Sequence, residues 1–271
     1  MRRDVVWVLA FLLCVGVNLS CSQPAVSFQT DNRLSPQTVG DGSPSSNPTP
    51  LTQQTLRVQL LETGGFHGNE VNARSGQQWL GLYANEQGSQ LILSKLKIEI
   101  VVDEIVDTGI PGQKTGKSVR ADREEEPIFL VRNAPMLQSG KAITIYGVNP
   151  DEPRVLLDRQ PLKLQLGDLV YELVLMGDEP SAQPNVLPLK NPRLILRQGP
   201  TEQVVYQLKQ GDEDAGWQLR WAGDIDGDGK LDLYANLPEH YNVTRRKLFL
   251  SSQAKLGQLV REVAEFVTTG C

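Results

Sequence analysis

The chain contains the stretch Gly223-Asp224-Ile225-Asp226-Gly227-Asp228-Gly229-Lys230-Leu231-Asp232-Leu233-Tyr234, in which four carboxylates lie within nine residues. Asp224, Asp226 and Asp228 are each separated by one residue, so a tightly curled loop can turn all three side chains inward. Gly229 tolerates the unusual backbone dihedral that such a loop needs. Carboxylate and carbonyl oxygens on a flexible loop suit Ca²⁺. The stretch therefore predicts a site for a hard cation, with Ca²⁺ as the expected cofactor.

The segments that flank this loop have the alternation of β-strands. Trp217, Leu219 and Trp221 share one side of the segment before it, and apolar residues alternate again after it, from Leu231. An EF-hand would need helices on both sides and a Glu at the last loop position, which is Ala235 here. A dockerin would need two copies of the loop, also with helices. Both of these calcium-binding families are therefore disfavoured.

The segment from Trp221 to Leu233 resembles the calcium loop of FG-GAP and VCBS repeats, which occur in integrin-type propellers and many bacterial surface proteins. Those loops join two β-strands. The resemblance implies cation ligands at five positions: Asp224, Asp226, Asp228, Lys230 (through its backbone carbonyl) and Asp232. It covers only this stretch, which occurs once, and a complete propeller needs a longer chain. The alternative is an Asp/Gly hairpin loop that binds no ion.

The rest of the chain predicts a mainly β fold with antiparallel sheets, either sandwich-like or partly propeller-like. A clear hairpin is expected where Leu162–Leu166 and Tyr171–Leu175 alternate on the two sides of Gly167-Asp168. Residues 254–267 have apolar residues at helical spacing but end in β-branched ones, so a short C-terminal helix and a strand are both open. Turn chemistry at 147–153 divides an N-terminal β region (55–149) from a C-terminal one (150–271).

The N-terminus has the features of an export signal. Arg2 and Arg3 precede an apolar run from Val5 to Leu19, which is too short for a comfortable transmembrane helix. We therefore expect a signal peptide over residues 1–20. Residues 21–54 are rich in Ser, Thr, Pro, Gln and Asn and lack apolar clusters, which predicts a disordered tether.

The residues around Cys21 resemble a bacterial lipobox, with Ser20 directly before the cysteine. The match is partial, because Asn18 stands where the lipobox usually has Leu. The resemblance implies lipid on Cys21 and a membrane as partner, and Ser22 resembles a signal for the outer membrane. The expected location is thus an outer-membrane lipoprotein on its periplasmic or cell-surface face. The alternative is a soluble periplasmic or secreted protein.

Composition and histidine usage narrow the function. The net charge is −5 and no basic patch is visible, which disfavours nucleic acid as a partner. The two histidines, His67 and His240, lie in unrelated contexts, so no zinc site or Ser-His-Asp triad is indicated. We expect a non-enzymatic exported bacterial lipoprotein with a structural Ca²⁺ loop and a role in the envelope or at the cell surface.

Two alternatives from other functional classes stay open. The first is a calcium-dependent surface module that binds a glycan or an envelope protein, neither of which the sequence identifies. The second is an extracytoplasmic hydrolase, because a pair of catalytic carboxylates can be assembled in space from distant positions of the chain.

Overall fold

The computed structural model describes residues 57–85, 88–109, 111–147, 152–179, 189–208 and 216–270. Every regular element within these ranges is a β-strand, and the strand ladders are antiparallel. The predicted mainly β, antiparallel fold is therefore confirmed. The predicted signal peptide, the tether and Cys21 lie outside the described residues. In the described ranges, no helix is long and apolar enough to span a membrane.

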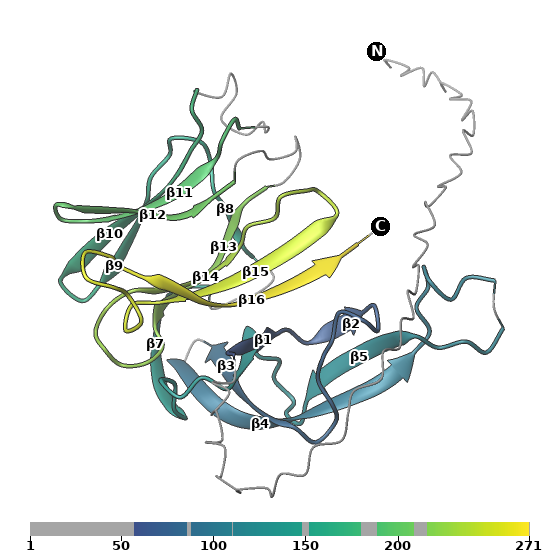
Figure 1. The fold of residues 1–271 in the computed structure, drawn as a ribbon. Coiled ribbons are helices and arrows are strands. Elements are labelled where there is room, and N and C mark those ends of the chain that lie inside the picture. Colours follow the sequence, from purple (N-terminus) through teal and green to yellow (C-terminus); the bar gives the residue numbers. More distant parts are fainter. Residues whose placement is uncertain are drawn as a thin grey trace, which may run out of the picture. The chain divides into compact units, whose positions relative to one another are not determined.

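A twelve-stranded sheet forms most of the structure (Figure 1). Nine of its strands follow one another along one path, in the order β1 (Gln59–Leu61), β6 (Phe129–Arg132), β3 (Gln78–Asn85), β4 (Gly88–Val101), β7 (Gly140–Tyr146), β13 (Gln218–Asp224), β14 (Asp232–Asn236), β15 (Val243–Leu250) and β16 (Arg261–Thr269). The two end strands, β1 and β16, lie against each other, so the path forms a nearly closed barrel. Three further strands pair at its margins: β2 (Gly64–Phe66), β5 (Gly116–Ala121) and β8 (Arg154–Val155).

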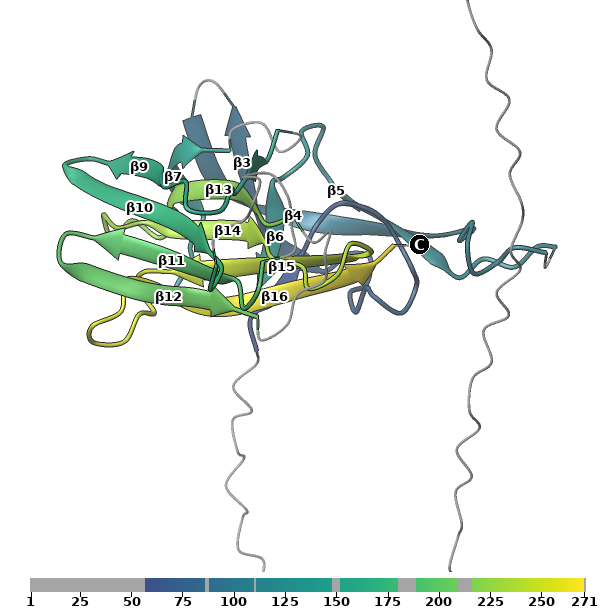
Figure 2. The same ribbon diagram turned by 90° about the horizontal axis from the view of Figure 1, so that it is seen from above.

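A separate four-stranded sheet has the order β12 (Thr201–Gln207), β11 (Arg193–Gln198), β10 (Leu169–Met176) and β9 (Leu162–Leu166). Figure 2 shows these strands next to β13–β16. The pairing of Leu166 with Leu169 confirms the hairpin that was predicted around Gly167-Asp168. The sheets thus form a nearly closed barrel plus a second sheet, which is neither a propeller nor a plain two-sheet sandwich.

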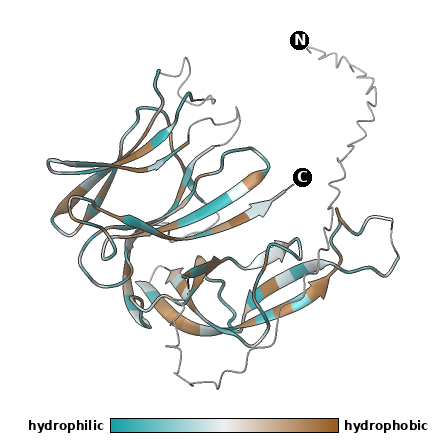
Figure 3. Cartoon of the chain, viewed as in Figure 1, coloured by the Kyte–Doolittle hydropathy of each residue, from teal (hydrophilic) through white to brown (hydrophobic). Residues whose placement is uncertain are grey.

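Two hydrophobic clusters lie on opposite faces of the strands β13–β16. The first fills the barrel and includes Trp221 and Tyr234. The second lies between the barrel wall and the four-stranded sheet and includes Leu233 and Phe249. Apolar segments accordingly recur along the strands of both sheets (Figure 3). All five residues of β14 are buried, because this strand has an apolar neighbour on each face.

Of the helix and the strand that were both open for residues 254–267, the structure forms a strand. Residues 261–269 are strand β16, which pairs with the whole of β15. Ala264 and Phe266 alternate inward toward the barrel, whereas Leu256, the first residue of the supposed helical stripe, is fully exposed in a turn. The ladder with β15 and the β-branched residues of the segment outweigh the apolar spacing that suggested a helix.

Strands from both sides of residue 149 contribute to the large sheet. β7, from the predicted N-terminal region, pairs with β4 on one side and with β13 on the other. Gly223 makes this last pairing feasible, because a Cβ at this position would lie 1.8 Å from the carbonyl oxygen of Ile143 in β7. The acidic loop therefore begins at a point where two strands approach each other unusually closely.

Buried charges shape the connection between β4 and β5. Asp103 Oδ1 accepts hydrogen bonds from the amides of Ile105 and Val106, and Asp107 accepts from Thr115 and from the amide of Asp103. The imidazole Nδ1 of His67 lies 2.5 Å from Asp103 Oδ2. This hydrogen bond raises the pKa of His67 and lowers the pKa of Asp103, and both side chains are largely buried.

The His67–Asp103 pair predicts a pH dependence of stability. The pKa of His67 in the folded protein lies above 6.5. The stability that protonated His67 adds to the fold is therefore complete below pH 6.5, and it is lost as the pH rises through the raised pKa. The contribution of Asp103 is lost only in acid, as the pH falls through a pKa below 3.8. His67→Asn keeps a donor but cannot titrate. We expect it to lower the free energy of unfolding by about 1.5–3 kcal/mol near pH 6 and by much less near pH 9, in urea titrations. An equal loss at both pH values would contradict a charged pair.

Candidate metal centre

The acidic stretch is the loop of a β-hairpin. β13 ends at Asp224, β14 begins at Asp232, and the ladder between them closes with Gly223 opposite Asp232. Gly227 and Gly229 have φ angles of 79° and 76°, in the left-handed region that glycine adopts without strain. The conformation expected at Gly229 is thus present, and Gly227 shares it. The two glycines let the chain reverse around the carboxylates.

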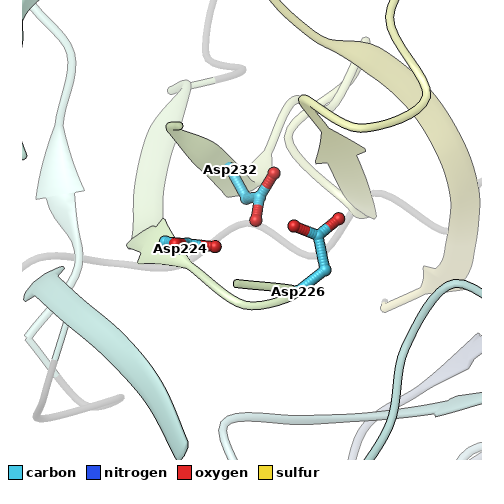
Figure 4. Close-up of side chains that lie close together, drawn as sticks. All are labelled: Asp224, Asp226 and Asp232. Carbon is cyan, nitrogen blue, oxygen red and sulfur yellow. The ribbon is translucent and has the colours of Figure 1, made fainter. Parts of the chain in front are cut away.

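Three of the predicted ligands converge. Each of Asp224, Asp226 and Asp232 offers one carboxylate oxygen, and these oxygens all lie within 4.8 Å of one another (Figure 4). Asp224 and Asp232 are buried, and Asp226 is half-buried. The three residues come from the end of β13, from the loop and from the start of β14. Because one ion can contact oxygens at such separations, the cluster can hold a metal ion.

The other two predicted ligands lie outside this group of three. Asp228 is exposed, and its carboxylate accepts hydrogen bonds from the hydroxyl of Ser251 at 3.0 Å and from the amide of Lys230 at 2.9 Å. Lys230 is also exposed, in keeping with a side chain directed to solvent. The role of its backbone carbonyl as a ligand stays a prediction.

Main-chain amides hold Asp224 and Asp232 in place. Asp224 accepts from the amides of Gly227 and Gly229, at 2.7 and 2.9 Å, so the loop wraps around this side chain. Asp232 accepts from the amide of Ile225 at 2.9 Å and from the amide of Ser251 at 2.8 Å. These bonds fix the positions of both carboxylates within the loop, and a preorganised ligand set needs less ordering to bind an ion.

Two serines of a neighbouring segment complete the polar shell, and sequence reasoning missed them. Ser251 and Ser252 follow directly after β15, which pairs with β14. The hydroxyl of Ser251 donates to Asp232 at 2.9 Å as well as to Asp228, and the hydroxyl of Ser252 donates to Asp226. Only the pairing of β15 with β14 brings these serines to the loop, so the sequence around the acidic motif carries no signal for them.

Burial raises the pKa of Asp232 to about 8. The hydrogen bonds from Ile225 and Ser251 lower this pKa, whereas the nearby charge of Asp226 raises it further. Burial also raises the pKa of Asp226, with further contributions from Asp228 and Asp224. Three carboxylates this close repel one another when all are ionised. A proton or a cation relieves that repulsion, so a bound cation would compete with the proton on Asp232.

The four-stranded sheet also reaches the loop. Tyr171 in β10 is buried, which raises the pKa of its phenol, and the negative charges of Asp228, Asp232 and Asp224 raise it further. The Tyr171 phenol forms a hydrogen bond with the backbone of Leu231, which lies within the acidic stretch. The loop is thus flanked by β13, β14, the serines after β15 and one strand of the second sheet, and its tip, residues 227–230, is exposed.

No protein-family model matches this chain, and neither the curated proteins nor the solved structures include a significant match. The resemblance of the loop to FG-GAP and VCBS repeats therefore stays a prediction that depends on the motif alone. The lipidation of Cys21 also stays a prediction, because that residue lies outside the described ranges.

Proposed function

We propose that this chain is an exported bacterial lipoprotein, without enzymatic activity, that carries a structural Ca²⁺ ion in the hairpin between β13 and β14. The observation that carries the proposal is the convergence of Asp224, Asp226 and Asp232, with oxygens within 4.8 Å of one another. In this proposal Asp228 and the carbonyl of Lys230 complete the ligand set, and Cys21 anchors the chain to an outer membrane.

The donor chemistry favours Ca²⁺. The cluster offers carboxylate oxygens, with serine hydroxyls close by, and includes neither His nor Cys. Hard divalent cations prefer such oxygens, whereas zinc and copper favour nitrogen and sulfur. An irregular loop suits Ca²⁺ better than Mg²⁺, which demands near-ideal octahedral geometry. Extracellular calcium sites bind with Kd of about 10⁻⁴–10⁻³ M, so an exported protein would keep such a site filled.

The position of the cluster favours a structural role over a catalytic one. The hairpin lies between the two hydrophobic clusters, and the start of β14 is fully buried. An ion here would hold the hairpin that both clusters share.

Calcium should stabilise the fold and a chelator should remove that effect. At calcium concentrations about 100-fold above Kd, binding adds about 2.7 kcal/mol to the free energy of unfolding. We therefore expect EDTA to lower Tm by several degrees, and Asp226→Ala to abolish the difference between calcium and EDTA in thermal scans. Asp168→Ala, in the exposed β9–β10 turn, is the matched control and should keep the full difference. Melting curves of the native chain that superimpose with and without chelator would refute the calcium site.

The lipid anchor predicts a specific mass. We expect intact-mass spectrometry of the exported protein to show a chain that begins at Cys21 and carries a lipid adduct, in the membrane fraction. Cys21→Ser should lack the adduct and appear in the soluble exported fraction. A mature chain that begins elsewhere, or that has the unmodified mass, would rule out the anchor and favour a soluble periplasmic or secreted protein.

A second candidate function is a protein-binding surface module, and an exposed apolar surface favours it. Trp79, Trp217 and Trp221 are all buried, so these three tryptophans do not form an exposed binding shelf. Four aliphatic side chains at the end of β4 and in the following connection are instead 50–55% exposed: Ile100, Val102, Ile105 and Val106. We call this set the apolar tip. Asp103 and Asp107 fix its backbone, so it is a preorganised surface of the kind that partners bind.

The apolar tip can be tested by photo-crosslinking in cells that export the protein. A photoreactive residue at position 105 should give a discrete adduct with another envelope protein, and Ile100→Ser in the same chain should weaken it several-fold. Val204, which is 48% exposed on the second sheet, is the matched control position and should give no adduct. Equal labelling at positions 105 and 204 would remove the support for this function.

A further inference from the structure

A cavity of about 380 Å³ adjoins the apolar tip. Two residues of the tip, Val102 and Ile105, belong to its lining, and they are 53% and 50% exposed. The lining also includes Thr244 in β15 and Thr268 and Thr269 at the end of β16. The volume lies within the range of ligand pockets, about 300–1,000 Å³. The exposed apolar surface therefore continues into a recess that is large enough to take a side chain of a partner.

The charges that line this cavity are mostly negative. The lining contains three carboxylates, those of Glu70, Asp103 and Glu104, and one imidazole, that of His67. The described residues that line it include neither lysine nor arginine. His67 is hydrogen-bonded to Asp103, so its charge offsets at most one of the three carboxylates. A recess lined by an excess of one sign of charge attracts ligands of the opposite sign.

Glu104 is the carboxylate in this lining that is available to a partner. Glu70 accepts hydrogen bonds from the amide of Thr269 at 2.6 Å and from the amide of His67 at 3.0 Å, and Asp103 is engaged by His67. The side chain of Glu104 is exposed, and within the described ranges its carboxylate has no hydrogen-bond or ion-pair partner. A basic group in the cavity can therefore pair with Glu104 without displacing an existing bond.

The bonds of the other two carboxylates hold the cavity walls in place. Glu70 joins the turn after β2 to Thr269 in β16, through both the amide and the hydroxyl of that threonine. The pair of His67 and Asp103 joins the same turn to the connection after β4. Walls that are fixed in this way lose little conformational entropy when a partner binds. The cavity is thus preorganised, like the backbone of the apolar tip.

We propose that the apolar tip and this cavity together bind an aliphatic segment of an envelope protein, and that a basic side chain of this segment enters the cavity and pairs with Glu104. The exposed side chains of the tip contact the aliphatic part of the segment, and the excess of carboxylates selects a positive charge. An acidic segment is disfavoured by like-charge repulsion. This inference rests on the second candidate function, because it names the chemistry of the partner that the apolar tip binds.

The preference for a positive charge can be tested on the purified full chain with three probes that share a six-carbon chain: hexylammonium, hexanol and hexanoate. Water solvates the charged probes better, so the informative quantity is the ratio of hexylammonium to hexanol affinity, compared between the native chain and Glu104→Gln. We expect this ratio to be about threefold larger in the native chain, as for an exposed ion pair. Titrations of ¹⁵N-labelled protein, followed through the amides of Thr268 and Thr269, give the affinities.

Glu99→Gln is the matched control, because Glu99 is exposed on β4 and lies outside the cavity lining. It should leave the affinity ratio unchanged. Added salt should weaken the binding of hexylammonium and leave that of hexanol nearly constant, because salt screens exposed charges. Equal ratios in the native chain and in Glu104→Gln, or hexanoate that binds as tightly as hexylammonium, would overturn the inference.

Photo-crosslinking from position 105 in cells tests the partner itself. We expect Glu104→Lys to weaken the protein adduct several-fold and Glu99→Lys to leave it intact. An adduct that Glu104→Lys leaves unchanged would preserve the second candidate function and refute only the basic side chain. The absence of a protein adduct in the native chain, or an adduct with lipid alone, would refute that function and this inference with it.

Discussion

The five-residue strand β14 is the constraint on which the rest of the structure depends, because it is buried on both faces. Tyr234 points into the barrel, where its ring lies 4.6 Å from that of Phe129, and Leu233 points toward the second sheet. A strand in this position has to keep its register, since a slip by one residue would exchange its two faces. The acidic loop sits at the start of this strand and closes its hairpin with β13.

The same position explains the electrostatic character of the loop. Asp232 is the first residue of β14, so its carboxylate is buried along with the strand, and its pKa rises to about 8. This carboxylate accepts hydrogen bonds from the amides of Ile225 and Ser251 and from the Ser251 hydroxyl. These bonds do not neutralise the charges on Asp224 and Asp226. A divalent cation would convert this repulsion into an attraction that links β13, the loop and β14. In that view the ion and the two hydrophobic clusters stabilise one and the same hairpin.

The features that point outward lie away from this hairpin. The sheet path ends at β1 and β16, which lie against each other without a shared ladder. The apolar tip extends from the β4–β5 connection, and two buried carboxylates hold its backbone. Surfaces held by well-packed elements can bind a partner at low entropic cost.

The sequence by itself determined the β class, the hairpin at Gly167-Asp168, and the acidic loop with its glycine at position 229, because alternation and turn chemistry act over a few residues. It also identified Asp224, Asp226 and Asp232, which lie close together in the chain. Only the tertiary structure decided that Ser251 and Ser252 join the loop and that residues 261–269 form a strand. Each of these depends on which distant strands pair, and pairing over long sequence distances leaves no local pattern to read.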